Sequence, residues 1–189
     1  NEENRRVWRS ALLTTEGLGE YISGTILFEE TLAQKTDAGN TIPEAAWAQK
    51  IVPGIKVDKG KGPLALSPGD LITFGLDGLA DRLRGYKAQG ARFAKWREVY
   101  AIEKHVPSQH GIEANAEMLA RYAAVCQEEG LVPIVEPEVL MDGSHEIDRH
   151  AEVTEAVQRE VFNALARHNV VLELMILKPN MVLPGKDKR

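Results

Sequence analysis

The chain has one cysteine, Cys126, in 189 residues. A single cysteine cannot form an intrachain disulfide framework, which favours a reducing, cytoplasmic location. No apolar run approaches the roughly 20 residues of a membrane-spanning helix, so we expect no membrane partner. The opening residues, Asn1 to Arg6, are charged and lack the apolar stretch of a signal peptide. Cys126 lies on the apolar side of a helical pattern and is expected in the core.

Basic clusters and metal-ligand patterns are scarce as well. The net charge is -5 and is spread along the chain, without the basic block that a phosphate backbone attracts, so we expect no nucleic-acid partner. His145 and His150 are five residues apart, the wrong offset for one helical face, and are expected at the surface or as caps. The other histidines are His105, His110 and His168. We predict no metal and no other cofactor.

Hydrophobic residues make up 43% of the chain, enough for a core. Segments rich in β-branched residues predict five strands, and their starts are about 30 to 40 residues apart, the period of strand–helix–strand units. The predicted strands are Thr25 to Phe28, Gly54 to Val57, Ala91 to Trp96, Val132 to Val135 and Val171 to Leu177. The stretch from Gly60 to Gly75, rich in glycine and proline, is predicted to be a loop.

Helical patterns separate the later predicted strands. Apolar residues recur every three or four positions between residues 76 and 86, 112 and 126, and 147 and 165. Another helix is predicted at Glu2 to Leu13. Gly90, Gly130 and the 167–169 cluster stand where the three later helices are expected to end. Repeated strand–helix units predict an α/β fold with a parallel sheet.

Polar residues near the strand ends distinguish the two parallel architectures. They come in pairs two residues apart, so each pair should face one way: Lys56 and Asp58, Lys95 and Arg97, Glu136 and Glu138, Lys178 and Asn180. In an open doubly wound sheet, apolar helices would cover that side, whereas in a (β/α)8 TIM barrel it faces the active-site mouth. We therefore predict a single partial TIM-barrel domain over residues 1–189, with about five of eight units. The first strand and the last two strands of the barrel are expected to be missing from these residues.

Lys178 is the strongest candidate for chemistry in this mouth. It ends an apolar strand and is followed at once by Pro179, so it should be held rigidly and partly desolvated. Burial and a second cation, for which Lys95 is the candidate, favour the neutral amine that attacks carbonyl groups. Glu136 is then suited to move the protons of imine formation. Ion pairing alone would equally explain why Lys56, Glu138 and Arg97 stand at the strand ends.

Four motifs resemble class I fructose-bisphosphate aldolase, in the order found in that family. They are Gly54-Ile55-Lys56-Val57-Asp58-Lys59-Gly60, Phe93-Ala94-Lys95-Trp96-Arg97, Val132-Pro133-Ile134-Val135-Glu136-Pro137-Glu138 and Leu177-Lys178-Pro179-Asn180-Met181-Val182. The opening Glu2-Glu3-Asn4-Arg5-Arg6 is similar too. The resemblance implies a metal-independent lyase that splits fructose 1,6-bisphosphate reversibly, acts in glycolysis and gluconeogenesis, and forms a homotetramer.

The resemblance also implies roles for individual residues. Lys178 would be the Schiff-base lysine and Glu136 the proton shuttle, while Lys95 would polarise the site. Glu138 would support the lysines. Arg97 and Lys56 would contact a substrate phosphate.

The chain departs from the family pattern in two ways. Leu174-Met175 and Leu183 replace smaller or polar residues and are expected to narrow the pocket. The family's first-strand aspartate and its last-strand phosphate-binding residues have no counterpart, so these 189 residues alone are expected to be inactive. Alternatives are another Schiff-base sugar-phosphate lyase, such as a transaldolase-like barrel, and a catalytically silent binding module. A zinc-dependent aldolase would need converging histidines.

Overall fold

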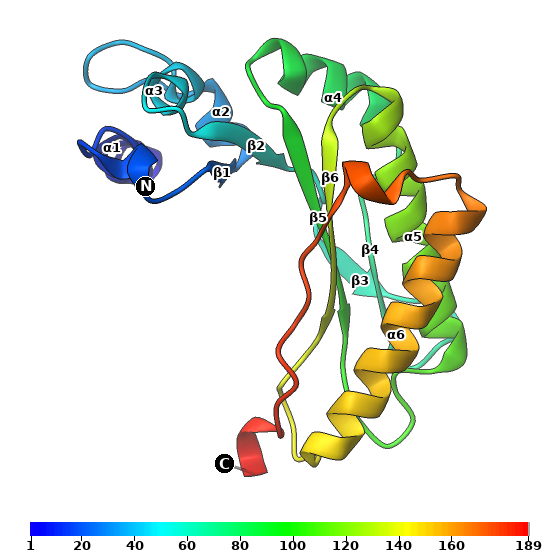
Figure 1. Ribbon diagram of the computed structural model, residues 1–189. Coiled ribbons are helices and arrows are strands. Elements are labelled where there is room, and N and C mark those ends of the chain that lie inside the picture. The colour runs from blue at the N-terminus through cyan, green and yellow to red at the C-terminus, as the bar shows by residue number, and fades with distance from the viewer. Residues whose placement is uncertain (189) are drawn as a thin grey trace.

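The computed structural model describes residues 1–188, and a five-stranded parallel sheet forms its centre. The strand order is β1-β2-β5-β6-β7 (Figure 1). Their bounds are β1 (Gly24–Leu27), β2 (Val52–Lys56), β5 (Phe93–Tyr100), β6 (Val132–Val139) and β7 (Ile176–Leu177). The α/β class, the parallel sheet and the number of strands in it are confirmed.

The helices form two groups around this sheet. In Figure 1, α1, α2 and α3 gather beside β1 and β2, and α4, α5 and α6 cover one side of β5 and β6. The bounds are α1 (Glu2–Leu13), α2 (Glu29–Ala33), α3 (Ile42–Ala48), α4 (Leu79–Ala88), α5 (Gln109–Glu128) and α6 (Ile147–Arg167). Short 3-10 turns are η1 (Leu18–Glu20), η2 (Leu172–Leu174) and η3 (Lys186–Lys188). None of the helices in residues 1–188 is both long and apolar enough to cross a membrane.

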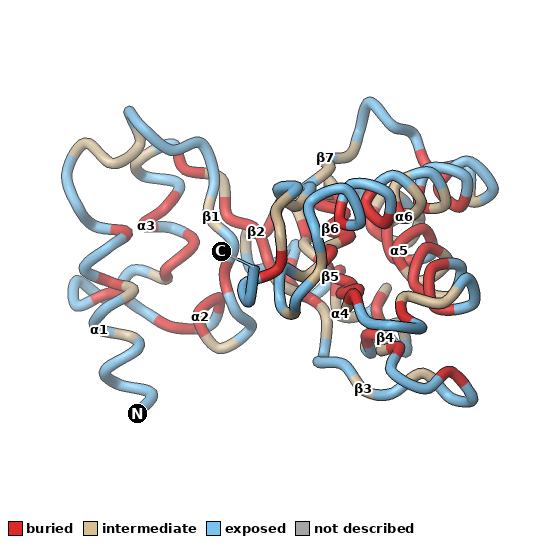
Figure 2. The backbone as a smooth tube through the Cα atoms, turned by 90° about the horizontal axis from the view of Figure 1, so that it is seen from below, coloured by how far each residue is buried: buried red, intermediate tan, exposed pale blue. Residues whose placement is uncertain are grey.

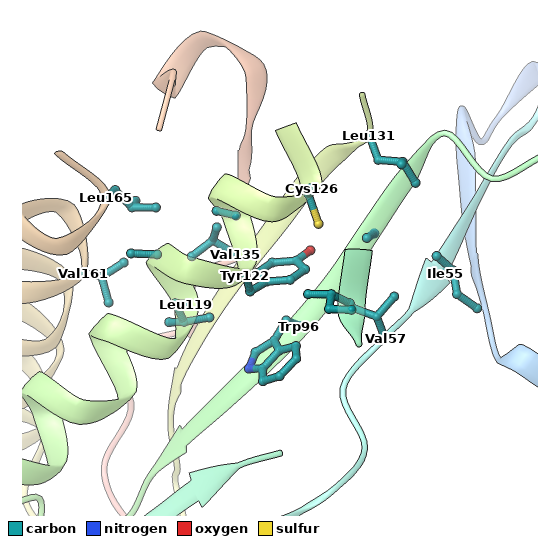
Figure 3. Packing of buried hydrophobic residues seen from close by; sticks show 14 of the residues in the cluster. Ile55, Val57, Trp96, Leu119, Tyr122, Cys126, Leu131, Val135, Val161 and Leu165 are labelled. Carbon is teal, nitrogen blue, oxygen red and sulfur yellow. The ribbon is translucent and has the colours of Figure 1, made fainter. Parts of the chain in front are cut away.

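The main core lies between the sheet and its covering helices. Alternate residues of β5, such as Ala94 and Trp96, are fully buried, because successive side chains of a strand point to opposite faces. Trp96 stacks on Tyr122 of α5 with 5.5 Å between ring centroids (Figure 3). Cys126 is buried as predicted, and this burial raises the pKa of its thiol to about 12. Buried segments concentrate where α5 and α6 meet β5 and β6 (Figure 2).

Local signals explain where the longer helices begin and end. The Ser108 side chain accepts a hydrogen bond from the Gly111 N–H and caps the start of α5. Gly130 follows the end of α5 with a φ of 72°, a left-handed conformation that glycine adopts without a Cβ clash. The predicted helix from Glu2 to Leu13 is confirmed with its bounds.

Two local predictions were wrong. Val171 to Leu177 is not one strand, because η2 precedes the two-residue β7. The segment from Gly60 to Gly75 is not only loop, because β3 (Lys61–Pro63) and β4 (Leu71–Thr73) pair as an antiparallel hairpin. Thr73, in β4, ties this hairpin to β5. Its N–H donates to Glu98 at 3.1 Å and its hydroxyl donates to the Arg97 carbonyl at 2.9 Å. Local amino-acid composition cannot predict these hydrogen bonds, because their partners are distant in the sequence.

The sheet has two edges in the described part of the chain. Within residues 1–188, β1 and β7 each pair with one neighbour, so the five strands form an open arc and not a closed barrel. Helices cover one face of β5 and β6 (Figure 1), and four charged side chains of these strands, Lys95, Arg97, Glu136 and Glu138, lie on the opposite face, as in the wall of a TIM barrel. The architecture is that of a partial barrel.

Candidate active site

Three of the predicted residues come together on the uncovered face of the sheet. Lys178 follows β7, and its N–H donates to the Val135 carbonyl at 2.9 Å, which continues the ladder and brings it alongside Glu136. Its Nζ donates a hydrogen bond to Glu136 Oε1. Lys95 Nζ, on β5, lies 2.6 Å from Glu136 Oε2. One carboxylate therefore bridges two lysines from the neighbouring strands.

Glu136 is the most enclosed member of this cluster. Its side chain is 5% exposed and that of Lys95 is 11% exposed, whereas that of Lys178 is 52% exposed. A buried carboxylate between two ammonium groups is compensated in charge. Lys178 remains open to solvent on the side away from Glu136, so a carbonyl compound can reach its Nζ while a proton acceptor stays in contact.

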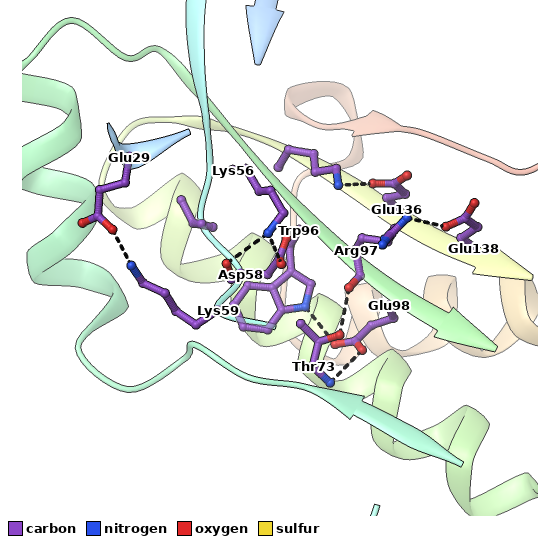
Figure 4. Close-up of polar contacts among 12 residues, drawn as sticks. Glu29, Lys56, Asp58, Lys59, Thr73, Trp96, Arg97, Glu98, Glu136 and Glu138 are labelled. Carbon is purple, nitrogen blue, oxygen red and sulfur yellow. Dashed lines mark hydrogen bonds and ion pairs between the residues drawn. The ribbon is translucent and has the colours of Figure 1, made fainter. Parts of the chain in front are cut away.

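Lys56 shares the sheet face but has a partner of its own. It pairs in register with Lys95, yet its Nζ forms an ion pair with Asp58 (Figure 4). The Asp58 carbonyl also accepts from the Lys56 Nζ at 3.3 Å. The Nζ lies 5.9 Å from the centre of the Phe28 ring.

Arg97 and Glu138 form a second pair nearer the strand ends. Arg97 Nη1 lies 3.0 Å from Glu138 Oε2, and both side chains are partly exposed (Figure 4). An exposed guanidinium with one carboxylate partner keeps donors free for an anion. Glu138 does not contact the lysines through any described hydrogen bond or ion pair.

The sequence prediction for Asn180 was wrong. Asn180 was expected to face the same way as Lys178, but its Nδ2 donates to the hydroxyl of Thr154 on α6 at 3.2 Å. Alternation along a strand fails here because β7 ends at Leu177. The Asn180 amide therefore contacts the helix layer.

A hollow of about 210 Å³ lies beside Lys178. Glu138, Met181 and Leu183 are among its lining residues, so Leu183 lies at the pocket that it was predicted to narrow. Leu174 and Met175 do not line it, and Met175 packs against the core instead. A larger apolar hollow of about 530 Å³ lies between α1 and β1, but the lysine–glutamate cluster is not part of its lining.

The described residues offer no ready metal site. In residues 1–188, His, Cys, Asp and Glu side chains nowhere form a group of three or more that could hold a metal ion. The expectation that His145 and His150 are surface or capping residues was wrong for His150, which is fully buried. The His145 and His150 ring centroids are 5.3 Å apart, and the two ring planes are tilted by 38°.

Glu98 is a buried ionisable residue that sequence reasoning missed. It is fully buried and accepts from the Trp96 indole N–H at 2.8 Å and from the Thr73 N–H (Figure 4). Burial raises its pKa to about 7, although these donors oppose the shift. The signal was available, since period-two alternation puts Glu98 on the same face of β5 as the core residue Trp96.

Replacing Glu98 with glutamine should change how stability depends on pH. Folded Glu98 binds its proton more tightly than the unfolded residue, with a pKa of about 7 against 4.5. Its contribution to the free energy of unfolding is therefore full below about pH 4.5 and is lost as pH rises through about 7. The loss amounts to about 3 kcal/mol, from 1.36 kcal/mol per pKa unit.

Urea unfolding at pH 5 and pH 8 tests this expectation. Glu98→Gln should gain stability relative to the wild-type protein as the pH rises, because glutamine cannot ionise. Glu113→Gln, at an exposed position of α5, serves as the control and should follow the wild-type protein at both pH values. Parallel curves for Glu98→Gln and the wild-type protein would contradict the assignment.

The comparisons with known proteins point to one family. The family model described as fructose-bisphosphate aldolase class-I matches residues 1–189. A probable fructose-bisphosphate aldolase class 1 from Xanthomonas axonopodis pv. citri is 60% identical over 186 residues, with 98% of this chain and 56% of the relative covered. The cytosolic fructose-bisphosphate aldolase 4 of Arabidopsis thaliana is 55% identical, with 98% and 47% covered.

A solved structure of a fructose-bisphosphate aldolase has the same fold as this chain. The fructose-bisphosphate aldolase from Plasmodium falciparum superposes with a TM-score of 0.96 at 49% identity, and the match covers 98% of this chain and 54% of that one. The chain thus spans about half the length of the relatives it matches. With a family model matched along all its residues and relatives at more than half identity, the chain belongs to the class I fructose-bisphosphate aldolase family.

Proposed function

We propose that the protein carrying these residues is a Schiff-base aldolase that reversibly cleaves fructose 1,6-bisphosphate into dihydroxyacetone phosphate and glyceraldehyde 3-phosphate. The observation that carries the proposal is the contact between Lys178 Nζ and the buried Glu136, which Lys95 holds from the other side. Membership of the family supports the substrate. Glycolysis and gluconeogenesis are the pathways in which this reaction would serve.

The chemistry begins with a proton transfer inside the cluster. Passage of a proton from Lys178 to Glu136 leaves a neutral amine that adds to the C2 carbonyl of the ketose. Glu136 then returns the proton to the carbinolamine oxygen, which leaves as water and yields the iminium ion. The positive charge of Lys95 helps to hold Glu136 in place during both transfers.

Cleavage follows from the electron-withdrawing iminium. A base, for which Glu136 is our candidate, removes the proton of the C4 hydroxyl, the C3–C4 bond breaks, and glyceraldehyde 3-phosphate leaves. The bond electrons form an enamine on Lys178. Protonation at C3 and addition of water release dihydroxyacetone phosphate and restore the lysine.

The remaining residues are proposed to bind and support the substrate. Arg97 and Lys56 would contact a phosphate, because each presents a cation on the open sheet face. Glu138 would orient Arg97 in this arrangement, in addition to the supporting role toward the lysines that the family resemblance implies. We further propose a homotetramer in the cytoplasm, a location supported by cytosolic relatives, although a chloroplastic relative also matches.

Borohydride trapping tests the proposed function. The intact protein is incubated with dihydroxyacetone phosphate and reduced with sodium borohydride, and the modified peptide is identified by mass spectrometry. We expect a stable adduct on Lys178, because only an iminium is reduced to a permanent secondary amine. An adduct on another lysine, or none, would contradict the nucleophile and the function with it.

A further inference from the structure

Asn180 connects the segment that carries Lys178 to two other parts of the fold. Its Oδ1 accepts from the N–H of Val139, at the end of β6, at 3.1 Å. Its Nδ2 donates to the Thr154 hydroxyl and to the Met181 carbonyl, both at 3.2 Å. Pro179, with its restricted φ, is the single residue between Lys178 and Asn180. The position of the Asn180 amide therefore constrains the position of the lysine.

The contacts of Asn180 set the direction of the bond to Thr154. Because a backbone N–H can only donate, the atom facing Val139 must be the amide oxygen, and the atom facing Thr154 must be the amide nitrogen. The Thr154 hydroxyl accepts from that nitrogen and still has its own proton to donate. The second side-chain atom in its reach is His150 Nδ1, at 3.2 Å.

His150 is suited to accept that proton. The residue is fully buried on α6, and this burial, together with the neighbouring His145, lowers the pKa of its imidazole. The ring is therefore neutral at neutral pH, with one acceptor nitrogen and one donor nitrogen. Acceptance at Nδ1 leaves the hydrogen on Nε2, and hydrogen bonding of the imidazole to the backbone of Val139 and of His150 partly opposes the lowering of its pKa.

We propose that His150 and Thr154 are positioning residues for Lys178 and act through Asn180. The hydrogen bonds run from Thr154 to His150 Nδ1 and from Asn180 to Thr154, and they tie the residues after β7 to the rigid α6. This tie holds Lys178 Nζ at the Glu136 carboxylate. The inference rests on the proposed function, since it assigns a purpose to the position of the nucleophile.

Thr154→Val tests the network in the intact protein, because valine keeps the shape of threonine and removes the hydroxyl. The measured quantities are kcat, KM for fructose 1,6-bisphosphate, and the rate of borohydride-trapped adduct formation per folded site. We expect kcat and the trapping rate to fall about tenfold to 100-fold, the scale of a misplaced reacting group. KM should stay within about twofold, because the residues proposed to bind phosphate are elsewhere.

Matched variants separate positioning from simple destabilisation. Thr154→Ser retains the hydroxyl and should restore the trapping rate to within about threefold of wild type. Val161→Ala removes core volume from the same helix without touching the network and should lower stability but not the trapping rate per folded site. If Thr154→Val does not fold, His150→Asn, which keeps an acceptor near the Nδ1 position, is compared with His150→Leu, and only the leucine variant should be slow.

Two outcomes distinguish failure of this inference from failure of the proposed function. A trapping rate for Thr154→Val within about threefold of wild type would overturn the positioning role and leave the aldolase assignment intact. Nitrogen-15 NMR of labelled histidine reports the His150 tautomer without any substrate. A hydrogen on Nε2 supports the network, and a hydrogen on Nδ1 overturns it whatever the enzyme does.

Discussion

Replacing Lys178 with alanine should abolish borohydride trapping and lower kcat/KM for fructose 1,6-bisphosphate by about 10⁴-fold or more, the scale seen when a covalent nucleophile is removed. The reason is that the other lysine of the cluster, Lys95, is largely enclosed and paired with Glu136. It cannot take the place of a half-exposed amine. Steady-state kinetics and trapping on the intact protein provide the measurement.

Two further variants make this result interpretable. Lys178→Arg keeps the positive charge and the contact with Glu136 but supplies no nucleophilic amine, so it should be as inactive as the alanine variant. Lys87→Ala removes a lysine that donates to the Glu129 carbonyl at the end of α5, outside the cluster, and should leave kcat unchanged. Lys178→Ala with wild-type activity would show that another group forms the imine, or that no imine forms.

Replacing Glu136 with glutamine should slow turnover by about 10²-fold or more, the usual contribution of a general acid–base residue. Glutamine occupies the same volume and can still accept a hydrogen bond from Lys178, but it cannot take up the protons that imine formation and cleavage release. The trapping rate with dihydroxyacetone phosphate should fall together with kcat. Lys95 also loses a buried counterion, so the variant should be less stable to urea.

Glu138→Gln is the matched comparison on the same strand. Its carboxylate pairs with Arg97 in a partly exposed position, and we place it outside the proton transfers. Its main effect should be a higher KM, through Arg97, with a smaller change in kcat than in Glu136→Gln. If Glu136→Gln slowed turnover less than threefold, the protons would have to move through another group.

The strand and helix periods were readable from local patterns. Successive residues of β5 and β6 point to opposite faces, so the spacing of Lys95 and Glu136 relative to the core residues Trp96 and Val135 was enough to predict which side chains share the open face. The apolar residues spaced three or four apart in the helices were likewise predicted to be buried. The orientation of Asn180 was not predicted correctly, because the alternation of side chains along a strand stops where β7 ends.

Contacts between distant segments could not be predicted from the sequence. The hairpin β3–β4 depends on bonds from Thr73 to Glu98 and Arg97, and its own strands are too short to be recognised by composition. His150 is fully buried and its ring lies 5.3 Å from that of His145, a contact between residues of the α6 helix and the segment before it that no helical offset indicates. Each of these features depends on residues that meet only after the chain has folded.

The amino-acid sequence by itself determined the parallel α/β architecture and the identity of the lysines and glutamates on one face of the sheet, because these depend on side-chain periodicity within single segments. Only the tertiary structure decided that Glu136 bridges Lys178 and Lys95, that Lys56 turns to Asp58, and that Asn180 reaches α6. Periodicity specifies which face a side chain occupies. Strand register and loop paths specify which neighbour it finds there, and those are set by long-range packing.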